Sequence, residues 1–196
     1  MTGGKLRHKN LVVISAPSGS GKTTICRELQ KRRPRWRFAV SCTTRPPRDY
    51  ENNGYDYEFL SEKEFFRRVD SGELVEHEEV HGYLYGTPRA EIDWALENDE
   101  VLLLEVDVKG GISIKEAYPR HALTVFVKPP SLEELKERLR NRGSESEEHI
   151  EKRMERVVME MAYEDQYDVS VVNDNLGDTV GRIIQVIEET KQEVEP

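Results

Sequence analysis

Residues 16–24 read APSGSGKTT and combine the residue types that can hold a phosphate chain. Gly19 and Gly21 allow the backbone to curl round an anion and approach it closely, because they carry no side chain. Lys22 can bridge two neighbouring phosphates, and the hydroxyl of Thr23 can ligate Mg²⁺. The apolar run LVVIS precedes the segment, and a helix is expected from Gly21. A strand, a glycine-rich turn and a helix in this order predict a phosphate loop.

The first position of this loop holds Ala16, where the general pattern has glycine. A small residue is acceptable there if the backbone needs no positive φ angle. An ordinary strand-to-helix turn is the alternative, and the agreement of strand, glycines, lysine, threonine and helix argues against it. Backbone N–H groups and the positive end of the helix dipole would then surround the phosphates. The expected nucleotide-binding residues of the loop are Ala16, Pro17, Ser18, Gly19, Ser20, Gly21, Lys22, Thr23 and Thr24.

A second anion site is indicated at residues 43–60, TTRPPRDYENNGYDYEFL. Arg45 and Arg48 lie three positions apart in a loop stiffened by two prolines, so they can form a fork for a second phosphate. Tyr57 can add a hydroxyl to the same group. A solvated basic turn is the alternative, which a lone RPPR would favour. The pair follows an expected core strand, however, and this places it near the mouth of a nucleotide cleft.

The elements that must position these residues alternate along most of the chain as short apolar runs and amphipathic helical stretches. Near-continuous apolar strands separated by helices are typical of a parallel sheet covered on both faces. The sequence therefore predicts an α/β fold with a five-stranded parallel sheet and helices on both faces. The expected strands are residues 11–15, 38–41, 101–107, 122–127 and 169–173.

Several positions mark where helices are expected to begin. Residues 61–64 and 131–134 each form a capping box, with serine at the first position and glutamate at the fourth. Thr87 followed by Pro88 predicts a cap with proline at the first helical position. Asp178 is expected to begin the last helix.

Two segments interrupt the alternation. Residues 42–95 contain short polar-rich strands, expected at 56–59, 73–80 and 83–86, which predict a small antiparallel sheet inserted between the second and third core strands. Residues 140–150 are highly charged and show no apolar periodicity before their last residue, which predicts a mobile segment between two helices.

The chain has 196 residues, of which 34% are charged, and a formal net charge of −9. This length suits one compact domain with room for a small insertion. An acidic surface repels a nucleic-acid backbone at long range, so we expect no nucleic-acid partner. An anionic ligand must instead be attracted by a local cluster of basic side chains.

Cys26 and Cys42 are the two cysteines, and without a wider cysteine framework they are expected to be reduced thiols. The N-terminal segment MTGGKLRHKN is too short and polar to be the apolar core of a signal peptide. No apolar run reaches membrane-spanning length. We therefore expect a soluble cytoplasmic protein without a membrane partner, and the sequence leaves its oligomeric state open.

The run T-T-R-x-x-R, the acidic residue after it and N-G-x-D-Y-x-F resemble the signature of guanylate kinases. These are phosphate-loop kinases that pass the terminal phosphate of ATP to GMP. The resemblance extends from the phosphate loop to VSVVN and Asp174, and family loops also read A-P-S-G at the position of Ala16. It implies the phosphate-loop NTPase fold and an ATP:GMP phosphotransferase that uses Mg²⁺. It also implies the use of dGMP and a role in guanine nucleotide recycling and synthesis.

The resemblance gives the two irregular segments a purpose, because water must be kept from the reacting phosphates. The insertion is expected to swing over the core when GMP binds, and the charged segment to close on ATP. The implied organisation is a core of residues 1–41, 96–139 and 154–196, a GMP-binding subdomain of residues 42–95 and a helical lid of residues 140–153.

The GMP phosphate is expected to contact four side chains that match the family motif. They are Arg45, Arg48, Tyr57 and Tyr85.

The guanine base is expected to be read by Ser41, Glu76 and Thr87, which match the family's base-reading positions. Guanine presents N1–H and an amino group as neighbouring donors, and a carboxylate accepts both. Adenine would leave that carboxylate unpaired, which costs about 1–3 kcal/mol or more. From spacing alone Glu78 and Glu79 are equal candidates, and only the resemblance selects Glu76.

Glu105 and Asp107 match the acidic pair that ends the third core strand of the family, where many members carry two aspartates. Both are expected at the GMP site, and Asp107 also near the metal waters or the acceptor clamp. The alternative for Asp107 is a cap of the turn into Lys109, Gly110 and Gly111.

Arg138, Arg142 and Arg153 match the lid arginines that meet the ATP phosphates after closure, and Asn173 matches a segment near the adenine. For Arg138, Arg140 and Arg142 the alternative is an exposed charged helix end paired with Glu133, Glu134 and Glu137. We expect it of Arg140, which the family motif does not claim. The residues expected to take part in catalysis are Lys22, Arg45, Arg138, Arg142, Arg153 and Asp107.

Two other functions compete with this one. A related kinase could act on another nucleotide or on a sugar phosphate, but the expected base readers argue against it. Guanylate-kinase-like domains of scaffolding proteins bind peptides with a degraded ATP site. The presence of Lys22, Thr23 and the lid arginines argues against that second function.

Overall fold

The computed structural model describes residues 9–80, 82–141 and 147–192. Residue 142, an expected lid arginine, and most of the charged segment around it lie outside the described residues. In chain order the elements are β1 (Leu11–Ser15), α1 (Lys22–Arg32), β2 (Arg37–Phe38), β3 (Cys42–Thr43), β4 (Glu58–Phe59), α2 (Glu62–Asp70), β5 (Leu74–Val80), β6 (Tyr83–Pro88), α3 (Arg89–Asn98), β7 (Leu102–Glu105), α4 (Val108–Ala117), β8 (Ala122–Lys128), α5 (Leu132–Asn141), α6 (Glu147–Met161), the short 3₁₀ helix Glu164–Gln166, β9 (Val169–Val172) and α7 (Leu176–Gln192).

The central sheet has five strands in the order β2-β7-β1-β8-β9, and every neighbouring pair is parallel. This confirms the predicted sheet. The predicted second strand, 38–41, was misplaced, because β2 covers only Arg37–Phe38 at the edge of the sheet. β7 ends at Glu105, so Asp107 lies beyond it. The carboxyl ends of β1 and β7 lie side by side. The phosphate loop, which follows β1, is therefore next to Glu105 and Asp107 at the end of β7.

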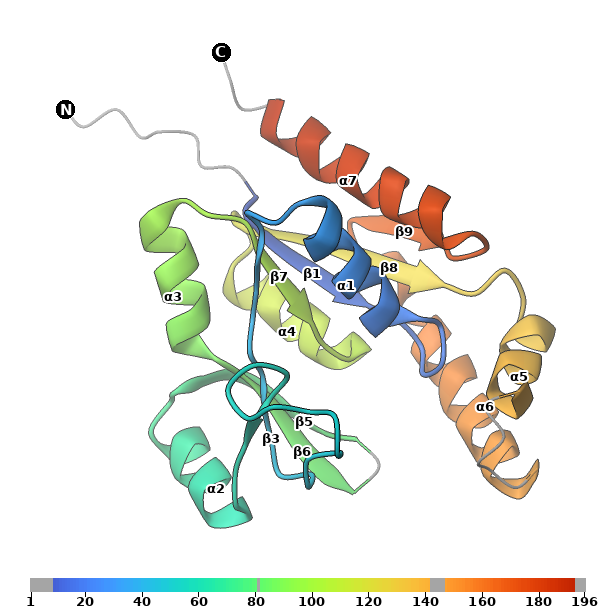
Figure 1. Cartoon of the computed structure of the whole chain (residues 1–196), viewed down its shortest axis with the longest axis horizontal. Coiled ribbons are helices and arrows are strands. Elements are labelled where there is room, and N and C mark those ends of the chain that lie inside the picture. Colours follow the sequence, from blue (N-terminus) through green and yellow to red (C-terminus); the bar gives the residue numbers. More distant parts are fainter. Residues whose placement is uncertain (1–8, 81, 142–146, 193–196) are drawn as a thin grey trace.

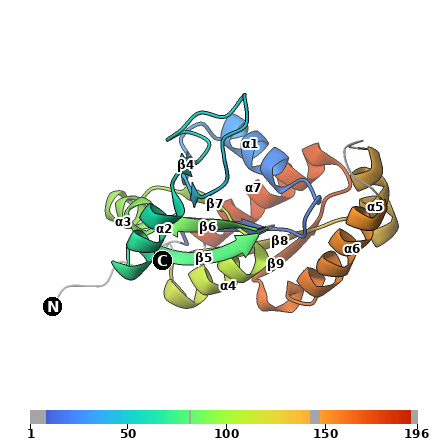
Figure 2. The ribbon, with the colours of Figure 1, turned by 90° about the horizontal axis from the view of Figure 1, so that it is seen from below.

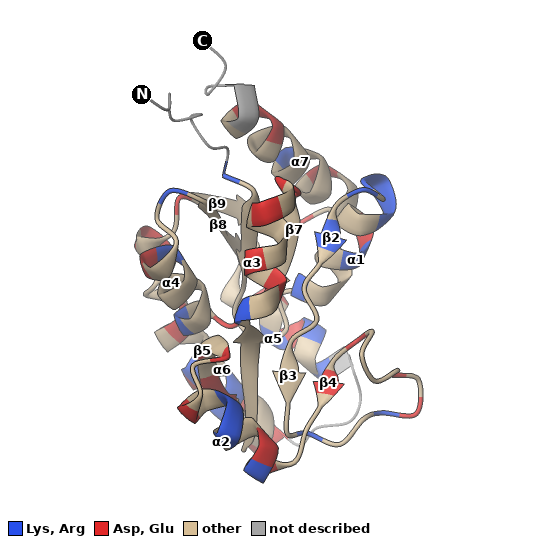
Figure 3. Cartoon of the chain, turned by 90° about the vertical axis from the view of Figure 1, so that its left-hand side faces the viewer, with Lys and Arg blue, Asp and Glu red and all other residues tan. Residues whose placement is uncertain are grey.

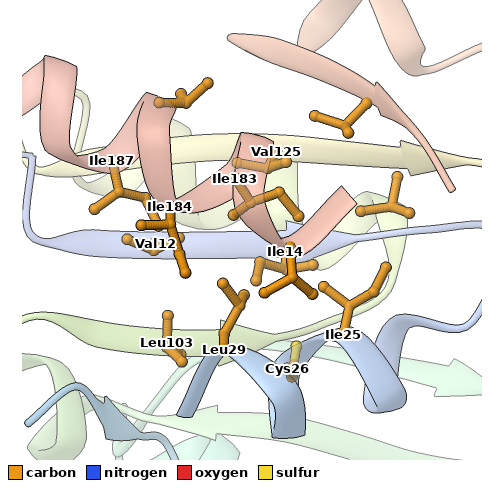
Figure 4. Close-up of a cluster of buried hydrophobic side chains, with 14 of the residues drawn as sticks. Val12, Ile14, Ile25, Cys26, Leu29, Leu103, Val125, Ile183, Ile184 and Ile187 are labelled. Carbon is orange, nitrogen blue, oxygen red and sulfur yellow. The ribbon is translucent and has the colours of Figure 1, made fainter. Parts of the chain in front are cut away.

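The two faces of the sheet are buried by different helices (Figure 1). Val12 and Ile14 of β1 pack in one cluster with residues of α1 and α7, as Figure 4 shows. Leu11 and Val13 point to the other face, where they join residues of α3 and α4 such as Ile114. Alternating residues of one strand therefore contribute to both cores, which explains why β1 has no polar residue before its last position.

A second sheet, here called the acceptor sheet, has the strand order β4-β3-β6-β5. The prediction of an antiparallel sheet was wrong in one part: β3 pairs with β6 in antiparallel fashion, but β3 and β4 are parallel. Residues 44–57, here called the acceptor loop, join those two strands. A parallel connection needs about a dozen residues, and this long crossover supplies them. Figure 2 shows the acceptor sheet beside the core, with α4 beneath β5.

The helix starts agree only in part with the prediction. Ser61 and Ser131 accept the expected capping bonds from the N–H groups three residues later. The predicted cap at Thr87 was wrong, because Thr87 belongs to β6 and α3 begins at Arg89. α7 begins at Leu176, two residues before the predicted Asp178. The side chain of Asn175 accepts the backbone N–H groups of Gly177 and Asp178.

Both cysteines are free, as predicted, and both are buried. Charged residues of both signs mix along helices such as α2 and α3, whereas β3 and β9 carry none (Figure 3). In the described part of the chain, no helix is long and apolar enough to cross a membrane.

Candidate active site

Ala16 packs in the hydrophobic core and has only 5% of its surface exposed. Among the described residues other than glycine, Asp99 alone has a positive φ angle. The backbone at Ala16 therefore needs no glycine, and the expectation that a small residue is acceptable there is confirmed.

The two inner glycines of the phosphate loop, in contrast, are required by the backbone. Gly19 and Gly21 have φ angles of 91° and 90°, which L side chains rarely adopt. A Cβ atom on Gly19 would also lie 2.8 Å from the side chain of Leu139 in α5, and one on Gly21 would lie 2.8 Å from the amide nitrogen of Asn173. The loop is thus closely packed by α5 and by the chain after β9.

Asn173 is buried beneath the phosphate loop. Its side-chain amide donates to the carbonyl of Ser20 at 2.7 Å, and its own carbonyl accepts two bonds from the guanidinium of Arg138 at 3.2 Å. Asn173 therefore braces the loop and holds Arg138 next to it. The expected contact of this segment with adenine stays a prediction.

Lys22 begins α1 and directs its ammonium group to the end of β7, where it donates to the carbonyl of Val106 at 2.8 Å. The hydroxyl of Thr23 donates to the carboxylate of Glu105 at 2.5 Å. The phosphate loop and the end of β7 thus meet. Glu105, expected at the GMP site, also lies against the expected metal ligand.

The donor set at Thr23 suits Mg²⁺, which prefers oxygen ligands, keeps several waters and is held by one or two protein oxygens together with substrate phosphates. A hydroxyl and a carboxylate lie in contact here. Within the described residues, no group of three or more His, Cys, Asp or Glu side chains could hold a metal by itself. Phosphate oxygens and water would therefore complete the coordination of an ion bound at this point.

The arginine fork of the acceptor loop is organised by Glu51. Both terminal nitrogens of Arg45 donate to its carboxylate, at 2.7 and 2.8 Å, and the backbone N–H of Arg48 donates to it at 2.8 Å. Only 5% of the Glu51 side chain and 11% of the Arg45 side chain are exposed. The hydrogen bonds from Arg45 hold the pKa of Glu51 below its usual range and raise the pKa of Arg45 in turn. The guanidinium of Arg48 is more exposed and donates to the hydroxyl of Tyr50.

Two tyrosines lie beside Arg45. The rings of Tyr57 and Tyr85 meet edge to face with centroids 6.0 Å apart, and the guanidinium of Arg45 lies 5.2 Å from the centre of the Tyr57 ring. Burial and the nearby carboxylate of Glu105 raise the pKa of Tyr57, so its phenol keeps its proton. A protonated phenol beside a guanidinium can donate to a phosphate oxygen.

Glu76 lies on β5 opposite Thr87 of β6. The buried hydroxyl of Thr87 donates to one carboxylate oxygen of Glu76 at 2.5 Å. Burial raises the pKa of Glu76 to about 7, and Asp107 and Glu78 add to that rise, while the bond from Thr87 opposes it. Gly110 approaches the other oxygen so closely that a Cβ atom would lie 2.6 Å from it.

A cavity of about 190 Å³ joins these parts. Lys22 of the phosphate loop lines this cavity. A larger hollow beside the cavity is lined by Thr23 and by both arginines of the fork. Thr87 does not line the cavity and reaches it through Glu76. The lining residues that the sequence assigned to GMP are Ser41, Tyr57, Glu76, Tyr85, Glu105 and Asp107.

Asp107 takes the capping position that was its alternative interpretation. Its carboxylate accepts the N–H of Gly110 at 2.8 Å at the start of α4, and it also lines the cavity. The same carboxylate can therefore set the start of α4 and face a substrate. A catalytic part for Asp107 stays a prediction.

The described lid arginines lie at the phosphate loop. Arg138 forms an ion pair with Glu134 in addition to its bonds with Asn173, and Arg153 donates to the hydroxyl of Ser18 at 2.8 Å. Arg140 is a charged residue at an exposed helix end, as expected, but its partner is Glu147 of α6, to which it donates two bonds, rather than a glutamate of its own helix.

The structure brings four groups to the site that the sequence did not predict there. They are Glu51, Gly110, Glu160 and the carbonyl of Val106. Glu51 lies three positions after Arg48, a spacing that is a weak signal in such an acidic chain. The other three have no local signal, because their contacts join segments far apart in the sequence.

A phosphate loop on a parallel sheet, joined by a cavity and a larger hollow to a fork of two arginines, is the arrangement of a phosphate-loop kinase with a separate acceptor site. The family model described as Guanylate kinase matches residues 8–190. The chain belongs to the guanylate kinase family.

Individual relatives agree with this assignment. A curated guanylate kinase of Thermotoga maritima is 40% identical over 184 residues, which cover 94% of this chain and 88% of that protein. One of Salinibacter ruber is 46% identical over 173 residues, covering 88% and 92%. The crystal structure of guanylate kinase from Anaplasma phagocytophilum has a TM-score of 0.78 at 30% identity and covers 93% of this chain and 86% of that one. A gluconokinase from Sinorhizobium meliloti, with a TM-score of 0.53 at 16% identity, shows only the common fold.

Proposed function

We propose that ATP is the phosphate donor, and GMP or dGMP the acceptor, in the guanylate kinase reaction that family membership assigns to this chain. The observation that carries this proposal is the shared cavity, which is lined by Lys22 of the phosphate loop and by Glu76, the expected reader of guanine. A phosphate held at the loop and a guanine held at Glu76 would therefore bring donor and acceptor into one cavity.

On the donor side, the backbone of the phosphate loop and the ammonium of Lys22 bind the ATP phosphates. Transfer of a phosphoryl group requires mainly alignment and neutralisation of charge. Arg138 and Arg153 already lie at the loop, and together with Arg142 they supply positive charge to the transferred group. Asn173 supports this arrangement from below through Ser20.

On the acceptor side, Arg45 and Arg48 hold the GMP phosphate, and Tyr57 and Tyr85 donate to it. The attacking phosphate oxygen is already anionic, so no strong general base is needed. Glu51 keeps Arg45 in a fixed orientation, which aligns the acceptor with the donor.

Guanine is selected by Glu76 together with Ser41 and Thr87. The bond from Thr87 fixes one oxygen of Glu76 and favours its ionised form, which can accept both N1–H and the amino group of guanine. With AMP, an ionised carboxylate would face an acceptor nitrogen, at a cost of about 1–3 kcal/mol.

Mg²⁺ would be held by Thr23, with Glu105 placed to accept hydrogen bonds from its waters. When bound, the ion neutralises phosphate charge. Asp107 lies beyond Glu105 at the same edge of the cavity, where it can orient the acceptor. We place the reaction in the recycling and synthesis of guanine nucleotides in the cytoplasm.

A coupled assay of ADP formation with equal concentrations of GMP, dGMP, AMP and UMP tests this function. We expect turnover with GMP and dGMP that disappears when Mg²⁺ is chelated. Comparable rates with AMP or UMP would contradict the assignment of guanine, and a lack of turnover with every acceptor would favour the peptide-binding class of domain.

A further inference from the structure

Glu160, near the end of α6, contacts the phosphate loop but has been given no function so far. Glu160 is buried, with 8% of its surface exposed. A buried carboxylate is costly unless it is paired and hydrogen-bonded, so its contacts indicate what it does.

Both oxygens of Glu160 have partners. Oε1 accepts a bond from Nε of Arg156, one turn earlier in α6, at 2.7 Å. Oε2 accepts the backbone N–H of Ser18, in the phosphate loop, at 3.1 Å. One carboxylate thus joins α6 to the loop.

A second residue of α6 reaches the same serine. Arg153 lies two helical turns before Glu160 and donates to the hydroxyl of Ser18 at 2.8 Å. Ser18 is therefore held through its backbone by Glu160 and through its side chain by Arg153. Two turns of a helix are rigid, so the distance between these two contacts is set by α6 itself.

We propose that Glu160 is a positioning residue for ATP. By accepting the N–H of Ser18, it fixes the phosphate loop against α6 and so places Arg153 relative to the loop phosphates. The proposal rests on the proposed function of the loop as the ATP site.

A simpler alternative is that Glu160 only neutralises Arg156 within α6. Two substitutions distinguish these roles. Glutamine keeps an acceptor oxygen but loses the charge, whereas aspartate keeps the charge but is shorter by one methylene. Acceptance from Ser18 requires reach, and neutralisation of Arg156 requires charge.

The experiment compares E160Q and E160D with the matched pair E148Q and E148D. Glu148 forms the same i,i+4 type of pair with Lys152 on α6, but both side chains are exposed. KM for ATP, KM for GMP, kcat and Tm are measured for each variant. The Kd values of a non-hydrolysable ATP analogue and of GMP are measured separately by calorimetry.

We expect E160D to weaken ATP and analogue binding about fivefold or more, with GMP binding unchanged, as befits one lost hydrogen bond to a charged acceptor. E160Q should stay within about twofold of the wild type, and both Glu148 variants should equal it.

Three results would overturn the proposal: normal ATP binding in E160D, a larger defect in E160Q than in E160D, or equal weakening of ATP and GMP. The calorimetric arm decides even if the wild type shows no turnover, so failure of the proposed function remains distinguishable from failure of the proposal.

Discussion

The donor and acceptor sides of the cavity are built in opposite ways. The donor side is centred on one continuous segment, residues 16–24, where backbone N–H groups at the start of α1 are expected to bind phosphate. The acceptor side gathers side chains from β5, β6, the acceptor loop and the end of β7. A site made from backbone tolerates changes such as Ala16, whereas a site made from side chains depends on each neighbour that orients them.

This difference predicts that the largest loss of turnover comes from the donor side, when Lys22, the charged side chain of the loop itself, is removed. K22A should lower kcat by about 10²–10³-fold, as the loss of a group that stabilises the transition state does. GMP binding should stay within about twofold, because the fork and Glu76 are untouched. Steady-state kinetics and calorimetry with GMP measure the two effects.

K63A is the control for K22A, since Lys63 is an exposed lysine of α2. It should behave as the wild type. Unchanged turnover in K22A would refute the role assigned to Lys22.

The same difference explains how much could be predicted from the sequence. The strand, glycine turn and helix of the phosphate loop were predicted correctly, because they are adjacent and each has a local signature. The acceptor site needed the resemblance to select Glu76 from its acidic neighbours, since its partner Thr87 is recognised only when β5 and β6 pair. Local signals also misassigned Thr87 as a helix cap, because pairing in a strand prevailed over its capping tendency. The crossover that makes β3 and β4 parallel has no local signal at all.

On the acceptor side, the geometry of the fork should matter more than its charge. R45K keeps the charge but loses the planar pair of donors that Glu51 orients. We expect KM for GMP to rise about 10–100-fold, with KM for ATP within about twofold.

R67K is the matched control, because Arg67 makes a similar two-bond pair with Glu64 on the exposed surface of α2. It should leave both KM values unchanged. An equal rise of KM for ATP and KM for GMP in R45K would show that Arg45 does not act on the acceptor side alone.

The pH dependence of GMP binding gives a smaller effect that belongs to the acceptor side alone. The pKa of Glu76 is about 7, and guanine requires its ionised form. Affinity for GMP should therefore fall as pH falls through 7, by about tenfold between pH 8 and pH 6 for a single group. Calorimetry across this range measures it.

E76Q removes this titration and leaves only that of the GMP phosphate, so the difference between the two profiles reports Glu76. Stability of the protein without GMP should change in the opposite sense. A carboxyl whose pKa is raised by folding binds its proton more tightly in the folded state. The free energy of unfolding should therefore decrease as pH rises from the usual pKa of a glutamate, 4.5, to the folded pKa of about 7. Identical profiles for E76Q and the wild type would contradict the assignment of Glu76 as base reader.

The smallest expected effect tests how closely the acceptor side is packed. In G110A the new Cβ would lie 2.6 Å from one oxygen of Glu76, so that carboxylate must shift, although the N–H that Asp107 accepts is kept. Because the end of a glutamate side chain moves easily, we expect KM for GMP to rise only about two- to fivefold.

G181A is the matched control within α7, where a Cβ meets nothing within 4 Å. It should raise the free energy of unfolding by about 0.5–1 kcal/mol and leave GMP binding unchanged. Unaltered GMP binding in G110A would mean that the position of Glu76 at rest is not the position that reads guanine, and that the acceptor side adjusts its side chains when the base arrives.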